Sequence, residues 1–305
     1  MAVVLGVDLS TVPAQFPDFT LGRTLILDGD SLAYKAAATS KRLDTAIRKF
    51  QSMVLTEMFV TASQFCTVHL TAVTCAKAGR GNIIGVKPYQ GQRKGKDKPP
   101  LLEPLREAVC TREHAMAEFD CKLHFDVEAD DAMMMQAYLL KDDGLIWSED
   151  KDLRMTPYPY WDMELGIAMK GEPEGYLKQA YTPGGSLKIV GQGPKFFWCQ
   201  MLMGDSADNV QGITRLHGKL CGPAGAFAAL DPIKGIDNIA NFVLDGYRAV
   251  DQNPLPEGYF LWLLRRHGDS FWHYLQELNL TEENRAFVNE CVTREWFKRA
   301  DGGAV

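Results

Sequence analysis

The chain has 305 residues, a formal net charge of −6 and 46% hydrophobic residues. This length and composition are typical of a globular protein with one large core or two domains, and they exclude a disordered or fibrous protein. No apolar run reaches the roughly 18 residues that span a bilayer, and the N-terminus does not resemble a secretory signal, so we expect a soluble protein without membrane contact.

Strands and helices alternate in the first part of the chain. Residues 25–27 form an apolar strand that ends at Asp28, and a helix is expected from Leu32 onward. The elements predicted next are a helix over 45–63, strands over 67–73 and 82–86, a helix over 101–119, a strand over 122–125, a helix over 129–140 and a strand over 144–147. This alternation favours an α/β fold with a parallel-rich sheet flanked by helices, whose ligands collect at the carboxyl ends of the strands.

The pattern changes in the second part of the chain. Short extended pieces dominate from 159 to 190, and helices are expected from 194 onward, with residues 196–203 as one of them. We therefore predict two domains, an α/β domain over 1–193 and a helical domain over 194–305. The seven cysteines are odd in number and form no CxxC pair, which disfavours a disulfide framework and a zinc site and indicates reduced thiols in the cytoplasm.

Acidic residues gather where predicted strands end and helices begin. Asp28 and Asp30 stand two residues apart after a strand, so both project to one side of an extended chain. Others open helices or follow strands in the same manner: Glu128, Asp130, Asp131, Asp150, Asp152, Asp205 and Asp208. Any single cluster is more simply explained as a helix cap or a solubilising group.

Taken together, these acids indicate a cation site. Two like charges about 4 Å apart repel by roughly 4 kcal/mol at an effective dielectric constant of 20, so a crevice that holds several carboxylates needs cations. Hard oxygen ligands select Mg²⁺ or Mn²⁺, and two such ions suit in-line displacement at a phosphodiester.

Cations gather between residues 87 and 98. Lys87, Arg93, Lys94, Lys96 and Lys98 lie there against the single acid Asp97. A solvated loop is the simpler interpretation of this segment alone, and a phosphate-binding loop is the functional one.

Five segments together resemble the 5′ nucleases, the family of flap endonucleases and 5′→3′ exonucleases, and most closely its free-standing bacteriophage members. They are LILDGDSLAYKAA at 25–37, YQGQRKGK at 89–96, VEADDA at 127–132, SEDKDL at 148–153 and GDSADNVQGI at 204–213. Their order and spacing make the combination more specific than any one segment. The resemblance covers residues 20–230 and implies a PIN-like catalytic domain followed by a helical domain of the helix-hairpin-helix (H3TH) type.

The resemblance also implies an activity, which is hydrolysis of DNA near 5′ ends to leave 5′-phosphate and 3′-hydroxyl products. It implies that the acids at 28, 128, 130 and 150 serve a first Mg²⁺ or Mn²⁺ ion, with Asp131 in the same acidic platform, and that those at 152, 205 and 208 serve a second. Expected partners are DNA with 5′ single-stranded ends, flaps or nicks, with RNA:DNA hybrids left open. The protein should be a monomer in the cytoplasm, that of a host cell if a phage encodes it.

Two DNA-binding regions are implied by the same resemblance. The first is an arch at about 87–120, in which Tyr89 stacks on a base and the cations clamp phosphates, namely Lys87, Arg93, Lys94 and Lys96. The second is a hairpin in the helical domain that binds duplex phosphates, with a K⁺ ion, through Gly212, Ile213, Gly222 and Gly225.

The sequence departs from the family pattern at three places. The segment HLTAVTCAKAGRG has Thr71, Ala72 and Thr74 where the family has a further metal-ligating Asp. Gln90 stands where the family has a Lys that helps to position the scissile phosphate, so Lys87 or Lys94 would have to supply that cation. An insertion over 214–221 precedes Gly222 in the hairpin.

Two alternatives remain at this point. A haloacid-dehalogenase-type phosphatase would use LILDGDS as its nucleophile loop and GDSADN as its acidic motif, but it expects an apolar strand before Gly204. A DNA-structure-binding protein descended from nucleases would explain the missing acid and Gln90.

Overall fold

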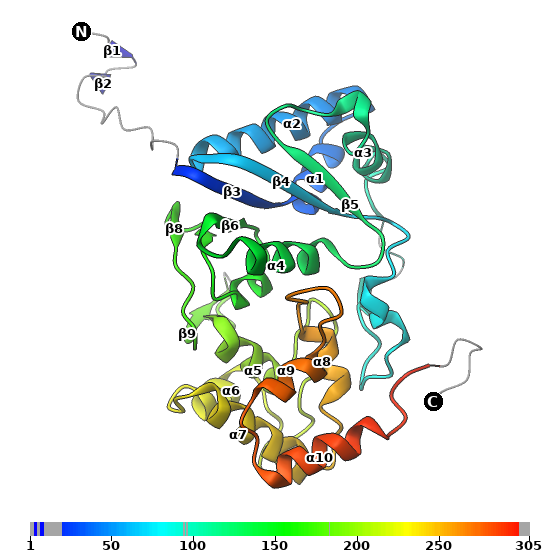
Figure 1. Ribbon diagram of the computed structural model, residues 1–305, viewed down its shortest axis with the longest axis vertical. Coiled ribbons are helices and arrows are strands. Elements are labelled where there is room, and N and C mark those ends of the chain that lie inside the picture. Colours follow the sequence, from blue (N-terminus) through cyan, green and yellow to red (C-terminus); the bar gives the residue numbers. More distant parts are fainter. Residues whose placement is uncertain are drawn as a thin grey trace.

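The computed structural model describes residues 20–93, 95, 97–182 and 184–298, and the backbone of two short paired strands, β1 (Val3–Val4) and β2 (Val7–Asp8). A sheet with helices on both faces forms one half of the described chain, and helices form the other half (Figure 1). Lys94 and Lys96, two of the predicted DNA-binding residues, lie outside the described residues.

The sheet has six strands. Their spatial order is β5 (Asp120–His124), β4 (Ser63–Thr71), β3 (Thr20–Asp28), β6 (Gly144–Trp147), β7 (Tyr160–Asp162) and β8 (Ile167–Met169). Every neighbouring pair is parallel except β7 with β8. The predicted α/β fold with a parallel-rich sheet is thus confirmed.

Side chains of the central strands alternate between two apolar cores. In β3, Leu25 and Leu27 face a core that they share with α1 (Gly29–Ala38), α2 (Leu43–Val60) and α3 (Leu102–Val109). Ile26 faces the opposite core, beside α4 (Ala129–Leu140). A strand turns successive side chains to opposite faces, and a strand buried on both faces therefore reads as the continuous apolar run seen here.

Glycine allows helix α1 to follow β3 without a gap. A Cβ atom on Gly29 would lie 2.6 Å from Val68 Cγ1 and 2.7 Å from His69 O, both on the neighbouring strand β4. The Asp28 side chain caps this helix by accepting hydrogen bonds from the backbone amides of Asp30 and Ser31. The close packing fixes the Asp28 carboxylate at the carboxyl end of the sheet.

The segment after β4 differs from the prediction in two places. The strand expected over 82–86 is wrong, because a 3₁₀ segment, η1 (Lys77–Asn82), is followed there by a single bridge from Ile83 to Phe297. The helix expected over 101–119 is shorter, since α3 covers only Leu102–Val109.

Helix α3 also changes the interpretation of the arch predicted at 87–120. Its apolar residues Leu102, Leu105 and Val109 are buried against α1 and α2, so this part of the segment belongs to the core. Lifting it into an arch would expose that apolar face to water. An arch stays a prediction only for the stretch before α3.

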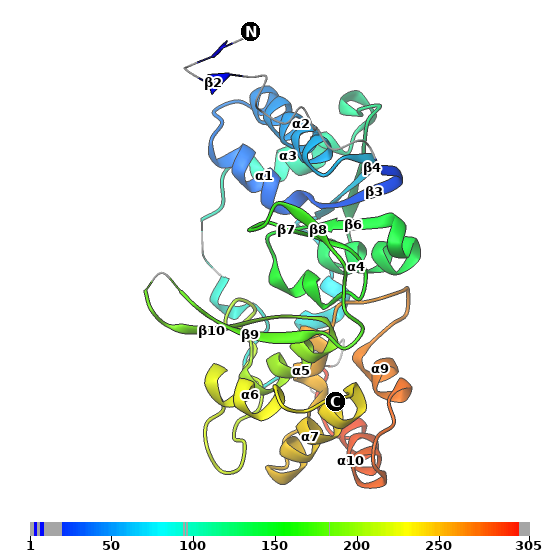
Figure 2. The ribbon, with the colours of Figure 1, turned by 90° about the vertical axis from the view of Figure 1, so that its left-hand side faces the viewer.

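The helical half begins at α5 (Gly193–Met203), next to an antiparallel hairpin of β9 (Tyr176–Tyr181) and β10 (Leu187–Gln192) that Figure 2 shows extending to one side. The helices that follow are α6 (Pro223–Leu230), α7 (Ile236–Ala249), α8 (Leu255–Leu261), α9 (Phe271–Glu277) and α10 (Glu282–Val292). Their core is continuous with the lower face of the sheet, where Ile146 and Met133 join Phe197 and Trp198. The domain boundary at 193 and 194 stays a prediction.

Two general expectations concern membranes and thiols. None of the helices in the described residues combines the length and the apolar character that crossing a membrane requires. All seven cysteines are free thiols.

A buried ion pair joins the two halves. Arg80 forms two hydrogen bonds to the Asp131 carboxylate, at 2.6 and 2.8 Å, and both side chains are almost inaccessible to solvent. The same guanidinium donates to the carbonyl oxygens of Tyr259 and Trp262, at the end of α8. Asp131 also accepts a hydrogen bond from the Leu264 amide, so the start of α4 is attached directly to the helical half.

We predict that Asp131→Asn lowers the free energy of unfolding by about 3–5 kcal/mol, because it takes from the buried guanidinium the carboxylate that binds it through two hydrogen bonds. Urea unfolding monitored by circular dichroism measures this. The matched control is Asp245→Asn, which removes a half-exposed acid paired with Arg248 and should cost less than about 1 kcal/mol. Equal effects in the two variants would contradict the structural role given to Arg80 and Asp131.

Candidate functional site

An acidic cavity of about 250 Å³ opens at the carboxyl ends of the parallel strands. Its walls come from the ends of β3 and β6, the start of α4, the segment 80–93, helix α3 and the region around α8. Seven of the eight predicted acids line it: Asp28, Glu128, Asp130, Asp131, Asp150, Asp152 and Asp208. The structure therefore gathers in one place side chains that the sequence separates by up to 180 residues.

The ends of two neighbouring strands place the first acids. Ser148, at the end of β6, donates a hydrogen bond of 3.0 Å to Asp28 Oδ2 and accepts one of 3.0 Å from the Asp150 amide. Because β3 and β6 are adjacent and parallel, their terminal residues meet at one edge of the sheet. Ser148 joins the two acidic turns and is a site residue that the motif reading did not single out.

Three of the acids form no ion pair in the part of the chain that the structure describes. Burial, and then the nearby Asp30, raises the pKa of Asp28 to about 6. Burial, followed by the charges of Asp150 and Asp28, raises the pKa of Asp130 well above its usual range. Asp150 lies at the open edge, yet the walls around it displace enough water to raise the pKa of its carboxyl. Lys151 offsets the charge of Asp150 only in part, so these three carboxylates together still attract cations.

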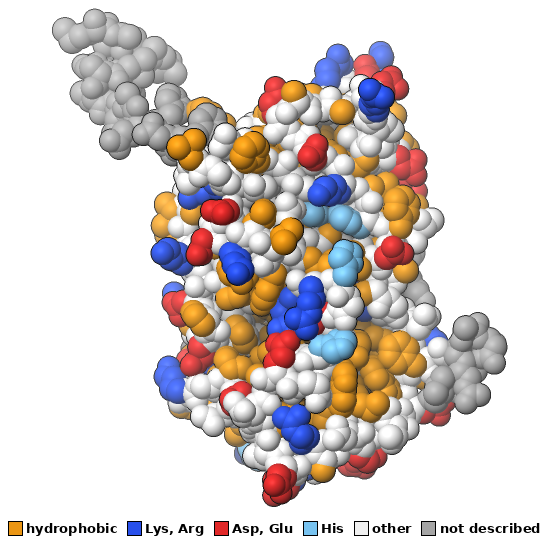
Figure 3. Space-filling model, in the orientation of Figure 1, with side chains coloured by type: hydrophobic (Ala, Val, Ile, Leu, Met, Phe, Trp, Pro, Cys, Tyr) orange, Lys and Arg blue, Asp and Glu red, His pale blue; other side chains and the backbone are white. Residues whose placement is uncertain are grey.

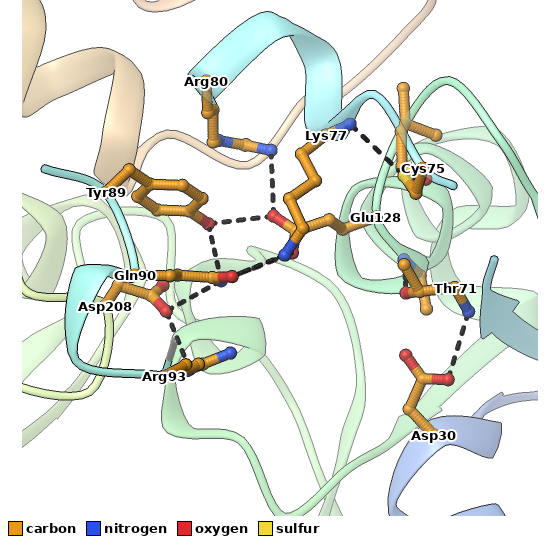
Figure 4. Close-up of polar contacts among 12 residues, drawn as sticks. Asp30, Thr71, Cys75, Lys77, Arg80, Tyr89, Gln90, Arg93, Glu128 and Asp208 are labelled. Carbon is orange, nitrogen blue, oxygen red and sulfur yellow. Dashed lines mark hydrogen bonds and ion pairs between the residues drawn. The ribbon is translucent and has the colours of Figure 1, made fainter. Parts of the chain in front are cut away.

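Glu128 is surrounded by donors instead (Figure 4). Lys77 Nζ lies 2.9 Å from Glu128 Oε1, the Tyr89 hydroxyl donates to Oε2 at 2.8 Å, and Arg80 lies 3.6 Å from Oε2. Burial alone would raise the pKa of Glu128, but Arg80 and Lys77 outweigh it and lower the pKa. The same Lys77 contacts Gln90 Oε1 at 2.5 Å, so a cation does stand beside Gln90, and it comes from η1 and not from Lys87.

A lysine occupies the space between two acids that the sequence assigned to a second ion. Lys151 Nζ lies 2.9 Å from Asp152 Oδ1 and 2.5 Å from Asp205 Oδ2. Gln200 Nε2 also bridges these two carboxylates, at 2.7 and 3.2 Å. Asp205 is buried behind the cavity and does not line it. Burial alone would raise the pKa of Asp205, but the charge of Lys151 outweighs burial and lowers it. For Asp152 burial is the larger effect, and it raises the pKa to about 6 despite Lys151.

Asp208 closes the other side of the cavity. Arg93 donates to Asp208 Oδ1 at 2.8 Å, and Gln90 Nε2 donates to the same oxygen at 3.1 Å. Burial nevertheless raises the pKa of Asp208. The negative charges of Asp152 and Asp208, which both line the cavity, are thus offset in part by Lys151 and Arg93.

The donor set suits Mg²⁺ or Mn²⁺ in its chemistry. Every uncompensated ligand is a carboxylate, and Mg²⁺ is commonly held by one or two carboxylates while it keeps several waters. Among the residues that the structure describes, no three His, Cys, Asp or Glu side chains stand close enough together to surround one ion. An Mg²⁺ or Mn²⁺ ion here would be held by carboxylates together with its own waters.

Asp131 is better explained as a structural residue than as a metal ligand. Its two oxygens accept hydrogen bonds from Arg80, from the Leu264 amide and from the Glu128 amide, and the side chain is fully buried. These bonds use the roughly four acceptor positions of a carboxylate. The structure thus disfavours the metal role predicted for Asp131.

The hairpin residues divide into two groups. Gly212 and Ile213 are buried, and their amides bond to Glu257 and to the carbonyl oxygens of Met201 and Leu202, so they have no donor free for a phosphate. Gly222 and Gly225 are exposed at the start of α6. Only this second pair is placed as a phosphate-binding turn requires.

The basic and aromatic residues of the segment 87–93 also divide. Lys87 is exposed, and Arg93 reaches the cavity. The ring centroids of Tyr89 and Phe260 lie 5.2 Å apart in a stacked arrangement, so one face of the Tyr89 ring is already covered and is not available to stack on a base. Arg106 is not among the predicted site residues, yet it lines the cavity from α3, and its guanidinium nitrogen lies 2.9 Å from an Asp30 carboxylate oxygen. No motif marks Arg106, because its position depends on how α3 packs.

The phosphatase alternative fails in its structural expectation. It requires an apolar strand before Gly204, but residues 193–203 form helix α5, as the sequence reading expected. The apolar run there is buried as a helix in the core of the second half.

No protein-family model and no curated protein matches the chain. Solved structures similar in fold include a protein of bacteriophage T5 crystallised with metal ions, at 14% identity and a TM-score of 0.48. A flap endonuclease of bacteriophage T5 in a pseudo-enzyme–product complex with DNA and metal ions has 15% identity and a TM-score of 0.43. Each likeness covers 88% of this chain and 98% of the other. These proteins are of the kind that the motifs resemble, and at such scores the likeness describes only the course of the chain.

We predict opposite stability effects for two acids in metal-free buffer. Asp130→Asn should raise the melting temperature by about 2–4 °C, because it relieves repulsion among uncompensated carboxylates at a gain of about 1 kcal/mol. Asp205→Asn should lower it, because Lys151 loses a buried partner. Thermal unfolding in excess chelator measures both. A decrease of similar size in both variants would show that Asp130 is not under strain from its neighbours.

Proposed function

We propose that this chain is a divalent-metal-dependent 5′ nuclease that hydrolyses DNA phosphodiesters near 5′ ends. The observation that supports this most directly is the cluster of Asp28, Asp130 and Asp150, which form no ion pair with any residue that the structure describes. Clustered carboxylates without cationic partners destabilise the folded state, and such destabilisation is typical of functional sites. The resemblance to the family rests on five sequence segments, and all five contribute side chains to the lining of the cavity.

The chain's own residues have distinct roles in this proposal. Asp28, Asp130 and Asp150 would hold Mg²⁺ or Mn²⁺, and such ions, once bound, activate water and stabilise the leaving oxygen of a phosphodiester. Glu128 would orient the site through its bonds to Lys77 and Tyr89. Arg93 and Arg106 lie at the cavity wall, where their guanidinium groups can hold phosphate oxygens in bidentate fashion.

The second ion would need a rearrangement. Lys151 stands between Asp152 and Asp205, so an ion could bind these acids only after the ammonium group moves away. This contact favours one alternative, a DNA-structure-binding protein with weakened turnover. We favour the nuclease because the uncompensated acids remain in place. A K⁺ ion at the hairpin and a role for Gly222 and Gly225 in duplex binding belong to the same proposal.

A panel of 5′-labelled substrates tests the activity. We expect short 5′ products from flap, nicked or blunt duplex DNA in Mg²⁺ or Mn²⁺, with 5′-phosphate and 3′-hydroxyl ends, and none in chelator. An RNA:DNA hybrid in the same panel measures tolerance of ribose. Binding of every substrate without product would identify the weakened binder, and hydrolysis of small phosphate esters alone would revive the phosphatase.

We expect Asp130→Asn and Asp150→Asn to lower the cleavage rate by about 100-fold or more, since losing a metal ligand should cost at least as much as losing a residue that only orients a ligand. DNA affinity, measured by fluorescence anisotropy, should stay the same or increase, because a negative charge is removed. Asp245→Asn, far from the cavity, serves as the control. Wild-type cleavage rates in both site variants would defeat the assignment.

A further inference from the structure

A second, larger cavity of about 680 Å³ shares no lining residue with the acidic cavity. It lies between strand β5, the outer side of α4 and the turn that joins α8 to α9. Figure 3 shows histidine, lysine and arginine side chains gathered in the middle of this face, with apolar side chains beside them. The nuclease proposal assigns it no role.

Basic side chains that line this cavity lack strong partners in the described part of the chain. The side chains of Lys122 and His267 are exposed and make no hydrogen bond or ion pair with any residue that the structure describes. Arg266 is 65% exposed, and its contact with Glu277 is a long one of 3.6 Å. An anionic group could therefore bind all three without breaking an existing strong pair.

Part of the lining of the cavity is apolar. Val127, Met135 and Leu139 line it, and Leu139 is 79% exposed although it lies on a well-formed helix. A methionine adapts its shape to different apolar partners. Exposed leucine beside exposed cations is a combination that suits a ligand with both apolar and acidic groups.

The walls are held rigidly. Arg265 is bound by Asp269 and Glu277, and its guanidinium lies 4.9 Å from the Trp262 ring centroid, which fixes the turn that carries Arg266 and His267. On the other side, His124 forms a hydrogen bond of 2.9 Å with His69. A preformed site lowers the entropic cost of binding.

We propose that this cavity is a docking site for a short acidic peptide segment of a partner protein, with an apolar side chain seated against Leu139 and Met135 and carboxylates at Lys122 and Arg266. Single-stranded nucleic acid fits less well, because the described lining holds no Phe or Trp side chain on which its bases could stack. Tyr138, the tyrosine in the described lining, already packs edge-on against Tyr158 at 5.1 Å. The site would attach the protein to a partner without covering the acidic cavity.

An array of random heptapeptides, probed with the labelled full-length protein, tests this. Bound peptides should be enriched in Asp or Glu together with Leu, Ile, Phe or Met, and the strongest of them is then synthesised for titration by fluorescence anisotropy. The double variant Lys122→Glu/Arg266→Glu should bind it about tenfold more weakly or worse, since two attractive contacts become repulsive. Lys41→Glu, an equally exposed charge reversal elsewhere, should leave the affinity unchanged.

Three results would overturn the proposal. They are an array without enrichment for acidic and apolar residues, an equal loss in Lys41→Glu, and displacement of the peptide by oligothymidine in wild type but not in the double variant, which would make the cavity a nucleic-acid site. Thermal unfolding of both variants verifies that they are folded. Cleavage of flap DNA should be the same as in wild type, so failure of the nuclease assignment would be seen separately.

Discussion

The buried guanidinium of Arg80 is the contact on which the arrangement of the site depends. It neutralises Asp131 at the start of α4, approaches Glu128 and binds two carbonyl oxygens at the end of α8. Taking an arginine out of water is costly, and only this full set of partners makes it tolerable. Consequently the helix that presents Glu128 and Asp130 cannot shift without breaking contacts on both sides of the molecule.

The charges of the site follow from this arrangement. Cations of the chain pair with Glu128, Asp205 and Asp208, whereas Asp28, Asp130 and Asp150 form no ion pair with a described residue. The first group is stabilised by the fold, and the second is destabilised by it. A protein that gains stability when an external cation binds the second group would have its folding linked to its cofactor.

Much of the fold could be predicted from local patterns. Helix 129–140 and strand 144–147 have the predicted bounds, because apolar periodicity and a capping acid define them within a few residues. The strand predicted at 82–86 failed since Ile83 is buried through a single long-range bridge to Phe297, which no local pattern reports. The gathering of the acids was predictable from strand ends. The positions of Lys77, Arg106 and Lys151 were not, because each depends on how segments distant in sequence pack together.

The apolar core continues from the lower face of the sheet into the helices, where Ile146 and Phe197 belong to one cluster. Packed side chains of the described residues therefore connect the acids to the exposed turn at Gly222 and set the distance between them. If the helical half binds a duplex while the acids act on the strand, the position of cleavage is set by the fixed distance between these two sites. Such a protein would cleave the strand at a fixed distance from the bound duplex, whatever bases stand at the cleavage position.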